Sequence, residues 1–316
     1  MAYQLLLGRE AENEEVVEHI QNSVDSLKDL RDLFLKSPEF FEKVENFLKD
    51  VQQFNPRHPF NLPPIPVEID CTEAEYDQMH ARIVKGWSIL GETDAFWSVL
   101  TQPQYHTNEF EKNKEQFFKS GKDSAGNFIS SLRRSGINHN LMHSCMDFGC
   151  GVARVSAHLA PHFTKVIGVD ISQPHLDLAK VHLDNLKIDN VELLHLKGYE
   201  SFNALPKVDV IFSVIVLQHN PPPIIFSLIK KLLGLLNPDG VAYFQVPTYK
   251  NGYLFEVNRY LSSEPTTSLE MHFLPQKEVF KAINQAGCEI LEVREDEWVG
   301  RGDIMLSNTF IVKKEN

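Results

Sequence analysis

From residue 144 onward, short apolar runs alternate with longer segments whose apolar residues recur every three to four positions. The short runs predict β-strands, and the longer segments predict helices with one apolar face. The expected strands are Ser144–Phe148, Lys165–Asp170, Val191–Leu196, Asp209–Val216 and Val241–Val246. Strands that alternate with helices form a parallel sheet with right-handed crossovers. The sequence therefore predicts an α/β fold with a doubly wound sheet.

The end of the chain continues this pattern with a predicted helix at Gln276–Ala286 and two strand-like runs, Glu289–Val293 and Thr309–Lys313. A length of 316 residues is about twice the usual domain size. Since 42% of the residues are hydrophobic and 23% are charged, the composition is that of a globular protein. We expect one complete α/β domain with a smaller appendage.

The first 135 residues are predicted to be mainly helical. Apolar residues from Glu14 to Val51 fall into three helical sets, and Ser37 before Pro38 is a typical N-cap. The prolines between residues 52 and 66 favour an extended segment. The expected regions are a helical module at 1–50, a proline-rich linker at 51–66, a helical cap and lead-in at 67–135 with a helix over Glu73–Leu90, and the main domain at 136–316.

Charge and apolar patterning disfavour several classes of partner. A net charge of −12 would repel a phosphate backbone, and the basic residues are scattered, so no nucleic acid is expected. The longest apolar stretch, Ile224–Leu236, contains two lysines and is too short for a bilayer of about 30 Å. Because the first ten residues lack the features of a secretory signal, we expect a cytoplasmic protein. The four widely spaced cysteines are expected to be free thiols.

A glycine-containing segment, Met146–Arg154, follows the first strand and opens a helix. Gly149 and Gly151 lie where the backbone must turn tightly against a ligand. A dinucleotide-binding loop would need a small residue three places after Gly151, and position 154 is Arg. Asp147, two places before the first glycine, is instead the residue that S-adenosylmethionine enzymes carry there.

With these residues the chain resembles the class I S-adenosylmethionine-dependent methyltransferase family, whose first motif is an acidic residue, any residue, then Gly-x-Gly-x-Gly. Ala153 replaces the third glycine. In the second match, Val166–Asp170, the carboxylate of Asp170 would hold two ribose hydroxyls; alternatively it only caps the helix that begins near Ser172. Leu236–Gly240 resembles the family's Leu-x-Pro-Gly-Gly turn, with Asp239 in place of the first glycine. The resemblance extends over about Gly121 to Lys314.

The resemblance implies a mostly parallel, seven-stranded sheet whose last strand, near Thr309–Lys313, is antiparallel, with S-adenosylmethionine as cofactor. The fourth strand should emerge at the carboxyl edge of the sheet, where open α/β folds bind ligands. The family also implies that residues 199 and 200 approach the adenine. The expected cofactor contacts are Asp147, Gly149, Cys150, Gly151, Asp170, Ile171, Tyr199, Glu200, Ser213 and Gln218.

Since the sulfonium already activates the methyl group, the protein must mainly align the acceptor and exclude water. A hydroxyl acceptor must also lose a proton, and His219, just past the fourth strand, is the candidate general base; the alternative is that it only caps or packs. No carboxylate lies in Leu217–Pro223, so no metal is expected. Candidate substrate-binding residues are Thr248, Tyr249, Asn251 and His272.

The sequence thus favours a methyltransferase that acts on the hydroxyl of a sugar or another small molecule. The suggestion of a glycan acceptor comes from resemblance: residues 5–10 resemble the start of a helical domain on bacterial enzymes of surface-glycan assembly, and residues 97–101, 217–223 and 245–249 look like proteins encoded among bacterial polysaccharide genes. Residues 1–50 would then serve docking or oligomerisation. The alternatives are an N-methyltransferase, an NAD-dependent oxidoreductase and a non-catalytic scaffold that binds S-adenosylmethionine.

Overall fold

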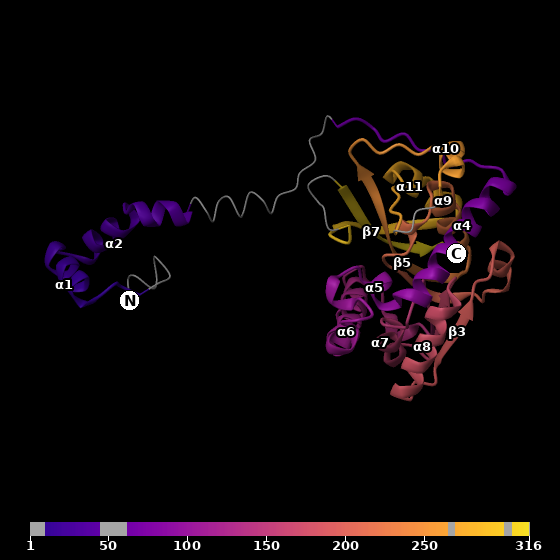
Figure 1. Cartoon of the computed structure of the whole chain (residues 1–316), viewed down its shortest axis with the longest axis horizontal. Helices are drawn as coiled ribbons and strands as arrows, with labels where there is room; N and C mark the ends of the chain where they lie inside the picture. Colours follow the sequence, from indigo (N-terminus) through magenta and orange to yellow (C-terminus); the bar gives the residue numbers. More distant parts are fainter. Residues whose placement is uncertain (1–9, 45–61, 265–268, 300–304, 316) are drawn as a thin grey trace. The chain divides into compact units, whose positions relative to one another are not determined.

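A computed structural model of the chain describes residues 10–44, 62–264, 269–299 and 305–315. The chain divides into two units, Met1–Phe60 and Asn61–Asn316, which are described separately (Figure 1). Residues 51–61 of the predicted linker lie outside the described residues. Among the described residues, no helix is long and apolar enough to span a membrane.

The first unit contains helices α1 (Glu14–Ser23) and α2 (Leu27–Leu35), and residues 38–44 are also helical. The predicted N-cap Ser37 accepts a hydrogen bond of 3.2 Å from the backbone N–H of Phe40. Phe34 is buried, whereas Leu27 and Phe41 are 85% and 59% exposed. The short helices thus carry apolar side chains on their surfaces.

The second unit begins with helices that precede the sheet. They are α4 (Glu73–Thr93), α5 (Ala95–Val99), η2 (Pro103–Tyr105), α6 (Phe110–Arg134) and η3 (His139–Leu141). A capping box starts α4, because Thr72 and Glu75 each accept a hydrogen bond from the other's backbone N–H. Just before α4, Val67 forms a parallel bridge with Phe255.

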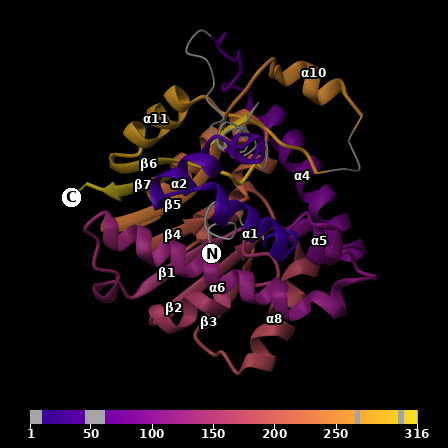
Figure 2. The same cartoon turned by 90° about the vertical axis from the view of Figure 1, so that its left-hand side faces the viewer.

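The sheet has seven strands in the order β3-β2-β1-β4-β5-β7-β6, which Figure 2 shows from bottom to top. Strand β7 is antiparallel to β5 and β6, and the pairings among β1 to β5 are parallel. This confirms the doubly wound, mostly parallel sheet with an antiparallel last strand. The strands are β1 (Ser144–Phe148), β2 (Lys165–Asp170), β3 (Val191–His195), β4 (Val208–Ser213), β5 (Leu236–Lys250), β6 (Cys288–Asp296) and β7 (Met305–Lys314).

Helices connect these strands on both faces of the sheet. They are α7 (Ser156–Leu159), η4 (Ala160–His162), α8 (Gln173–Leu186), η5 (Tyr199–Ala204), η6 (Leu217–His219), α9 (Pro222–Gly234), α10 (Val257–Ser262) and α11 (Gln276–Gln285).

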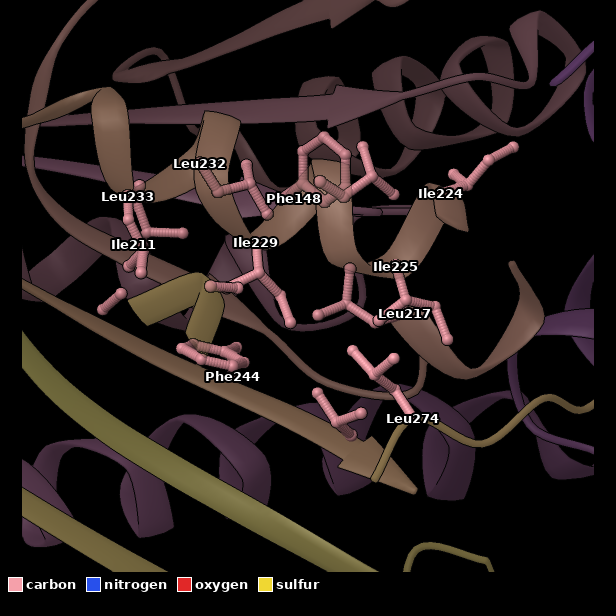
Figure 3. Packing of buried hydrophobic residues seen from close by; sticks show 14 of the residues in the cluster. Phe148, Ile211, Leu217, Ile224, Ile225, Ile229, Leu232, Leu233, Phe244 and Leu274 are labelled. Carbon is pink, nitrogen blue, oxygen red and sulfur yellow. The ribbon is translucent and has the colours of Figure 1, made fainter. Parts of the chain in front are cut away.

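Alternate side chains of the strands enter two hydrophobic cores, as the pleat of a sheet requires. On one face, Phe148, Ile211 and Phe244 pack with α9, and Figure 3 shows its Ile229 and Leu232 between them. On the other face, residues such as Cys145, Val210 and Tyr243 pack against Phe128, Ile129 and Leu132 of α6. Both faces are therefore covered, and the ends of the parallel strands are left for a ligand.

Several strand bounds differ from the predicted ones, and the end of β4 and the start of β5 differ for reasons that are local. Strand β4 ends at Ser213 rather than Val216, because Ile215 has a φ of 61° and turns the chain out of the sheet. Strand β5 begins at Leu236 and so includes the segment expected to be a turn. Within it Asp239 has a φ of 61°, the left-handed conformation that the glycine of the family's pattern adopts without strain.

Candidate functional site

A cavity lies where the carboxyl ends of three neighbouring strands meet. Strand β1 is paired with β2 on one side and β4 on the other, and all three are parallel. In open α/β sheets, ligands bind in such a crevice, where the connections leave in opposite directions. Residues at the strand ends that line the cavity are Asp147, Phe148, Gly149, Cys150, Gly151, Val169, Asp170, Ile171, Leu196, Phe212, Val214, Ile215, Val216 and Asn220.

The loop after β1 has the tight backbone that its glycines predict. Gly149 and Gly151 have φ values of 78° and 53°. A Cβ atom on Gly149 would lie 2.3 Å from Cγ2 of Val216, so a side chain there would collide with the exit of β4. Ala153 also has a left-handed φ, 60°, where the family's third glycine would sit. The loop can thus bring backbone N–H groups close to a ligand.

Asp170 ends β2 with its carboxylate beside this loop. Oδ2 accepts a hydrogen bond of 2.8 Å from the backbone N–H of Gly151, and Oδ1 accepts one of 2.9 Å from that of Ser172. The second bond closes a local turn before α8, whose N-cap is Ser172 and which has no side-chain cap hydrogen bond. Because each carboxylate oxygen has a further lone pair, both can still accept a hydroxyl from a ligand.

Asp147 is 3% exposed and lines the same cavity. Its Oδ2 accepts a hydrogen bond of 2.6 Å from the hydroxyl of Ser156. Burial raises the pKa of Asp147 to about 6, although Ser156 and Arg154 act in the opposite direction. Burial also raises the pKa of the neighbouring Cys150 thiol, so this cysteine is neutral and unreactive. A ligand cation near Asp147 would compensate for the buried charge.

The lead-in helices supply a wall of the cavity whose residues the sequence analysis did not name as site residues. His80, Ile83 and Trp87 of α4 line it, at the three-to-four spacing of one helix face. Ser98 and Val99 of α5 line it as well. The periodicity of α4 was visible in the sequence, but which face meets the cofactor loop depends on tertiary packing.

His175 of α8 is another lining residue that sequence reasoning missed. It is 1% exposed, and its ring nitrogens lie 2.7 Å from Ser172 Oγ and 2.9 Å from Ser98 Oγ. Each serine also donates its hydroxyl proton to a backbone carbonyl, Ser172 to that of Trp87 at 3.1 Å and Ser98 to that of Ala95 at 2.8 Å. These hydrogen bonds join the lead-in helices to the start of α8.

The predicted contacts after β4 are buried behind the cavity wall. Ser213 donates a hydrogen bond of 3.1 Å to the carbonyl of Phe148, and so connects β4 to β1. Gln218 is 2% exposed and accepts a bond of 3.1 Å from Gln245. Neither residue lines the cavity. Tyr199 and Glu200 lie in η5, and their side chains are outside the described part of the structure.

His219 lies one residue before Asn220, which lines the cavity. Its Nδ1 donates a hydrogen bond of 2.8 Å to the carbonyl of Glu270, which leaves Nε2 as the acceptor nitrogen. The ring meets Trp87 edge-on at 5.2 Å, and Trp87 stands in the cavity wall. Burial lowers the pKa of His219 to about 4, against the opposing effect of the Glu270 carbonyl. His219 is therefore neutral at pH 7, in the tautomer that a general base requires.

The four candidate substrate-binding residues lie near the end of β5 and do not line this cavity. Thr248 is buried and donates a hydrogen bond of 2.5 Å to Asn308, and the Tyr249 hydroxyl donates to the carbonyl of Pro63 at 3.0 Å. Asn251 is exposed. His272 contacts the Tyr253 hydroxyl at 2.9 Å and Glu270 at 3.2 Å.

Glu270 connects the loop beside His219 to the lead-in helices. It pairs with Arg82 at 2.7 Å and accepts a hydrogen bond of 2.7 Å from Tyr260. Burial alone would raise the pKa of Glu270, but hydrogen bonds from His272, Tyr260 and Arg82 lower it to about 2. Among the described residues, no group of three or more His, Cys, Asp or Glu side chains could hold a metal ion.

Comparison with known proteins identifies the central part of the chain. Residues 146–242 match the family model of a methyltransferase domain. The chain is 23% identical over 154 residues to the ubiquinone biosynthesis O-methyltransferase of Acinetobacter baylyi, covering 47% of this chain and 64% of that protein. It is 32% identical over 105 residues to the Coxiella burnetii protein of the same name, covering 31% and 41%. The chain thus spans less than two thirds of the length of these relatives.

Solved structures with a similar arrangement were also found. One is an S-adenosylmethionine-dependent methyltransferase from Clostridium acetobutylicum, with 14% identity and a TM-score of 0.48, covering 66% of this chain and 99% of that one. Another is magnesium protoporphyrin IX methyltransferase from Synechocystis with bound SAH, with 17% identity and a TM-score of 0.47, covering 69% and 99%.

The matched segment runs from β1 into β5 and contains the glycine loop, Asp170 and the exit of β4. The sheet around it has the seven strands and the antiparallel β7 that the resemblance implied. Residues 146–242 of the chain therefore match a methyltransferase domain, and the fold around them is the one that the resemblance implied.

Proposed function

We propose that this protein transfers a methyl group from S-adenosylmethionine to a hydroxyl group of a sugar or another small molecule. The observation that carries the proposal is the cavity at the ends of β1, β2 and β4, into which Asp147, the glycine loop and Asp170 all face. The name of the relatives in Acinetobacter and Coxiella, ubiquinone biosynthesis O-methyltransferase, supports transfer to oxygen. It does not by itself favour a sugar over other hydroxyl acceptors.

The residues present fit S-adenosylmethionine as the cofactor. The absence of a side chain at Gly149 lets the exit of β4 pack closely on the glycine loop, since a Cβ atom there would lie 2.3 Å from Cγ2 of Val216. Asp170 offers two oxygens to a ribose diol, and Ile171 and Leu196 offer apolar surface beside it. When bound, the cofactor supplies a methyl group that its sulfonium already activates. The chain's own part is to bind the cofactor, orient the acceptor and exclude water.

His219 is the proposed general base for the acceptor hydroxyl. Its Nδ1 is fixed by the Glu270 carbonyl, so Nε2 carries the lone pair that would take the proton. A pKa of about 4 makes this histidine a weak base, since a base works best when its pKa is near the working pH. An acceptor must also displace the contact between Nε2 and the side-chain amide of Gln218, at 3.3 Å. Positioning therefore contributes most of the rate in this proposal.

The apolar character of the cavity bears on the acceptor. Ile83, Trp87 and Val99 form the wall that the lead-in helices supply. An aromatic ring such as that of Trp87 can stack on the apolar face of a sugar or of another flat acceptor. Thr248, Tyr249, Asn251 and His272 remain proposed acceptor contacts. The first three lie at the end of β5, and His272 lies between α10 and α11. The first 50 residues are proposed to serve docking or oligomerisation, which the exposed Leu27 and Phe41 support.

The test has two steps. Calorimetry with S-adenosylhomocysteine and with NAD⁺ compares the two cofactor classes, and we expect binding of the first alone. Transfer of an isotopically labelled methyl group is then measured with hydroxyl acceptors and with their amine counterparts. Label in the amines alone would favour the N-methyltransferase. Cofactor binding without transfer to any acceptor would favour the non-catalytic scaffold.

A further inference from the structure

An ion pair between Arg82 and Glu270 lies outside the cavity and joins two parts of the chain. Arg82 belongs to α4, and Glu270 lies between α10 and α11. The two side chains are 13% and 20% exposed, their N···O distance is 2.7 Å, and neither residue lines the cavity. A buried ion pair adds little stability on balance, because both charges lose their water. The geometry that the pair fixes is therefore more informative than its contribution to stability.

Arg82 fastens both the end of α10 and Glu270 to α4. Its guanidinium lies 4.2 Å from the centre of the Tyr260 ring and donates a hydrogen bond of 3.0 Å to the carbonyl of Tyr260. It also donates to the carbonyls of Ser263 and Glu264, at 3.1 and 3.2 Å. Of the two carboxylate oxygens of Glu270, Oε1 accepts from Arg82 at 2.7 Å and Oε2 from the Tyr260 hydroxyl at 2.7 Å. These bonds leave Glu270 little freedom to move relative to α4.

The backbone of Glu270 contacts the proposed general base. Its carbonyl accepts a hydrogen bond of 2.8 Å from Nδ1 of His219. Two residues further on, the backbone N–H of His272 donates to the carbonyl of Gln218 at 2.7 Å, so this segment runs beside the exit of β4. One residue therefore carries both contacts, because the side chain of Glu270 is bound to α4 and its carbonyl is bound to His219.

Helix α4 thus acts on His219 by two routes. Trp87 meets the imidazole ring edge-on at 5.2 Å, whereas Arg82 acts through Glu270. A neutral histidine carries its proton on either ring nitrogen, and the hydrogen bond made by one nitrogen selects the tautomer. Because a carbonyl can only accept, that of Glu270 holds the proton on Nδ1 and leaves the lone pair on Nε2.

We propose that Arg82 and Glu270 are positioning residues, whose ion pair keeps the carbonyl of Glu270 where it selects the tautomer and the orientation of His219. This inference rests on the proposed function, because His219 is the proposed base of that reaction. Neither side chain contacts the cofactor or the acceptor in this account. The alternative is an ion pair that only joins α4 to the end of α10 and acts on stability alone.

The first measurement is the ¹⁵N NMR spectrum of the histidine side chains at neutral pH, which distinguishes a protonated ring nitrogen from an unprotonated one. The signals of His219 are assigned by their absence from His219→Asn. Arg82→Met and Arg82→Lys are compared with the parent, and Arg82→Met/Glu270→Gln is a second form that leaves no buried carboxylate without its cation. The control is Arg134→Met, which breaks an ion pair of the same length, 2.7 Å, between α6 and β6.

We expect the parent and Arg134→Met to show one tautomer of His219, with the proton on Nδ1. The two variants that lack the guanidinium should show a mixture of tautomers, and Arg82→Lys should retain part of the parent's signal because it keeps a cation at this place. Calorimetry should give each variant the parent's affinity for S-adenosylhomocysteine, since Arg82 does not line the cavity. A single tautomer with the proton on Nδ1 in either folded variant without the guanidinium overturns the inference.

The second measurement is turnover with the hydroxyl acceptor that takes up label in the transfer assay. Arg82→Met should lower kcat by about 10- to 100-fold with little change in KM, as expected when a reacting group is slightly misplaced. In a chain that already carries His219→Asn, the same change should lower kcat by less than about threefold, because the base that it positions is gone. Equal losses in the two backgrounds overturn the inference. Absence of label in every acceptor overturns the proposed function instead, and the tautomer of His219 in Arg82→Met then decides the inference by itself.

Discussion

The side-chain oxygen of Gln245 accepts a hydrogen bond of 3.0 Å from the backbone N–H of Ile215, a residue with a left-handed φ of 61°. A β-branched residue rarely adopts this conformation, which costs about 1–3 kcal/mol and is found mostly at functional sites. Gln245 is fully buried and also donates to Gln218 at 3.1 Å and Ser307 at 2.7 Å. One amide on β5 thus fixes the strained exit of β4 that lines the cavity.

Gln245→Leu should therefore destabilise the protein by about 2–4 kcal/mol, because the buried N–H of Ile215 loses its partner together with the polar groups of Gln218 and Ser307. Ser307→Ala is the control that removes one of the three contacts, with an expected cost of about 1 kcal/mol. Urea unfolding measures both. If the free energy of unfolding of Gln245→Leu lies within about 0.5 kcal/mol of the parent's, the amide does not hold the strained turn.

Titration of Asp147 should make the stability of the parent depend on pH, and the Asp147→Asn variant should lack this dependence. Burial raises its pKa from 3.8 to about 6, so between these values the folded chain binds more protons than the unfolded chain. Its contribution to stability therefore falls as pH rises through this window and is constant above it. Relative to the parent, Asp147→Asn should gain up to about 3 kcal/mol between pH 4 and 7.

The stability gain of Asp147→Asn should be accompanied by weaker binding of S-adenosylhomocysteine, because a buried carboxylate that would accompany a ligand cation is lost. Urea midpoints at four pH values and calorimetry at pH 7 test the two parts. A difference in stability that does not change with pH would show that the folded carboxyl titrates like an exposed one.

His219→Asn should lower turnover by about 10²–10⁴-fold with near-normal cofactor affinity, as expected on removing a positioned base. The pKa of His219 is lowered to about 4, so the pH profile of turnover should show no step near pH 6.5 from this residue. The same shift means that its contribution to stability is complete above about pH 6.5 and is lost as pH falls toward 4.

The matched control for His219 is His139→Asn, since His139 is likewise buried, at 2% exposed, but lies in η3 before β1 and not beside Asn220 and Trp87 of the cavity wall. The His139→Asn variant should have a lower free energy of unfolding, with no specific loss of turnover. The measurement is turnover from pH 5 to 9 with the true acceptor, where partial recovery of His219→Asn at high pH is expected as the hydroxyl ionises unaided. If turnover of His219→Asn stays within about threefold of the parent, positioning alone accounts for catalysis and His219 is not the base.

A chain that begins at Asn61 should fold and bind S-adenosylhomocysteine with unchanged affinity, because the cavity and both cores belong to the second unit. Few contacts are expected to cross the proline-rich segment. Thermal unfolding and calorimetry of the shortened chain provide the test, and light scattering of both forms reports on oligomerisation. Loss of cofactor binding together with a collapsed melting transition would show that the first 60 residues belong to the main core.

The strand pattern was readable in the sequence because buried parallel strands are short, apolar and bounded by turn residues. The bounds of β1 and β2 match the prediction. The exit of β4 was not predictable, since the left-handed Ile215 depends on Gln245, a residue that is distant in sequence. Local propensity cannot report such a constraint.

The cofactor loop was found because its glycines and Asp147 lie within a few residues of one another. Arg154 and His175 were missed because their significance comes from burial against helices α5 and α6, which the sequence places far away. A charged residue at the start of a helix that should face the core was the available signal. The substrate candidates Thr248, Tyr249, Asn251 and His272 do not line the cavity, and their contact with an acceptor stays a prediction.

The most direct measurement of the central claim is the affinity of S-adenosylhomocysteine for Asp170→Ala. Losing the charge-assisted hydrogen bonds to the ribose should weaken binding by about 10- to 100-fold. The control Asp177→Ala removes a carboxylate of α8 that does not line the cavity and accepts a hydrogen bond of 2.8 Å from Gln173, and it should leave affinity unchanged. Circular dichroism confirms folding of both variants. Unchanged calorimetric affinity in folded Asp170→Ala would contradict the assignment of this cavity to S-adenosylmethionine.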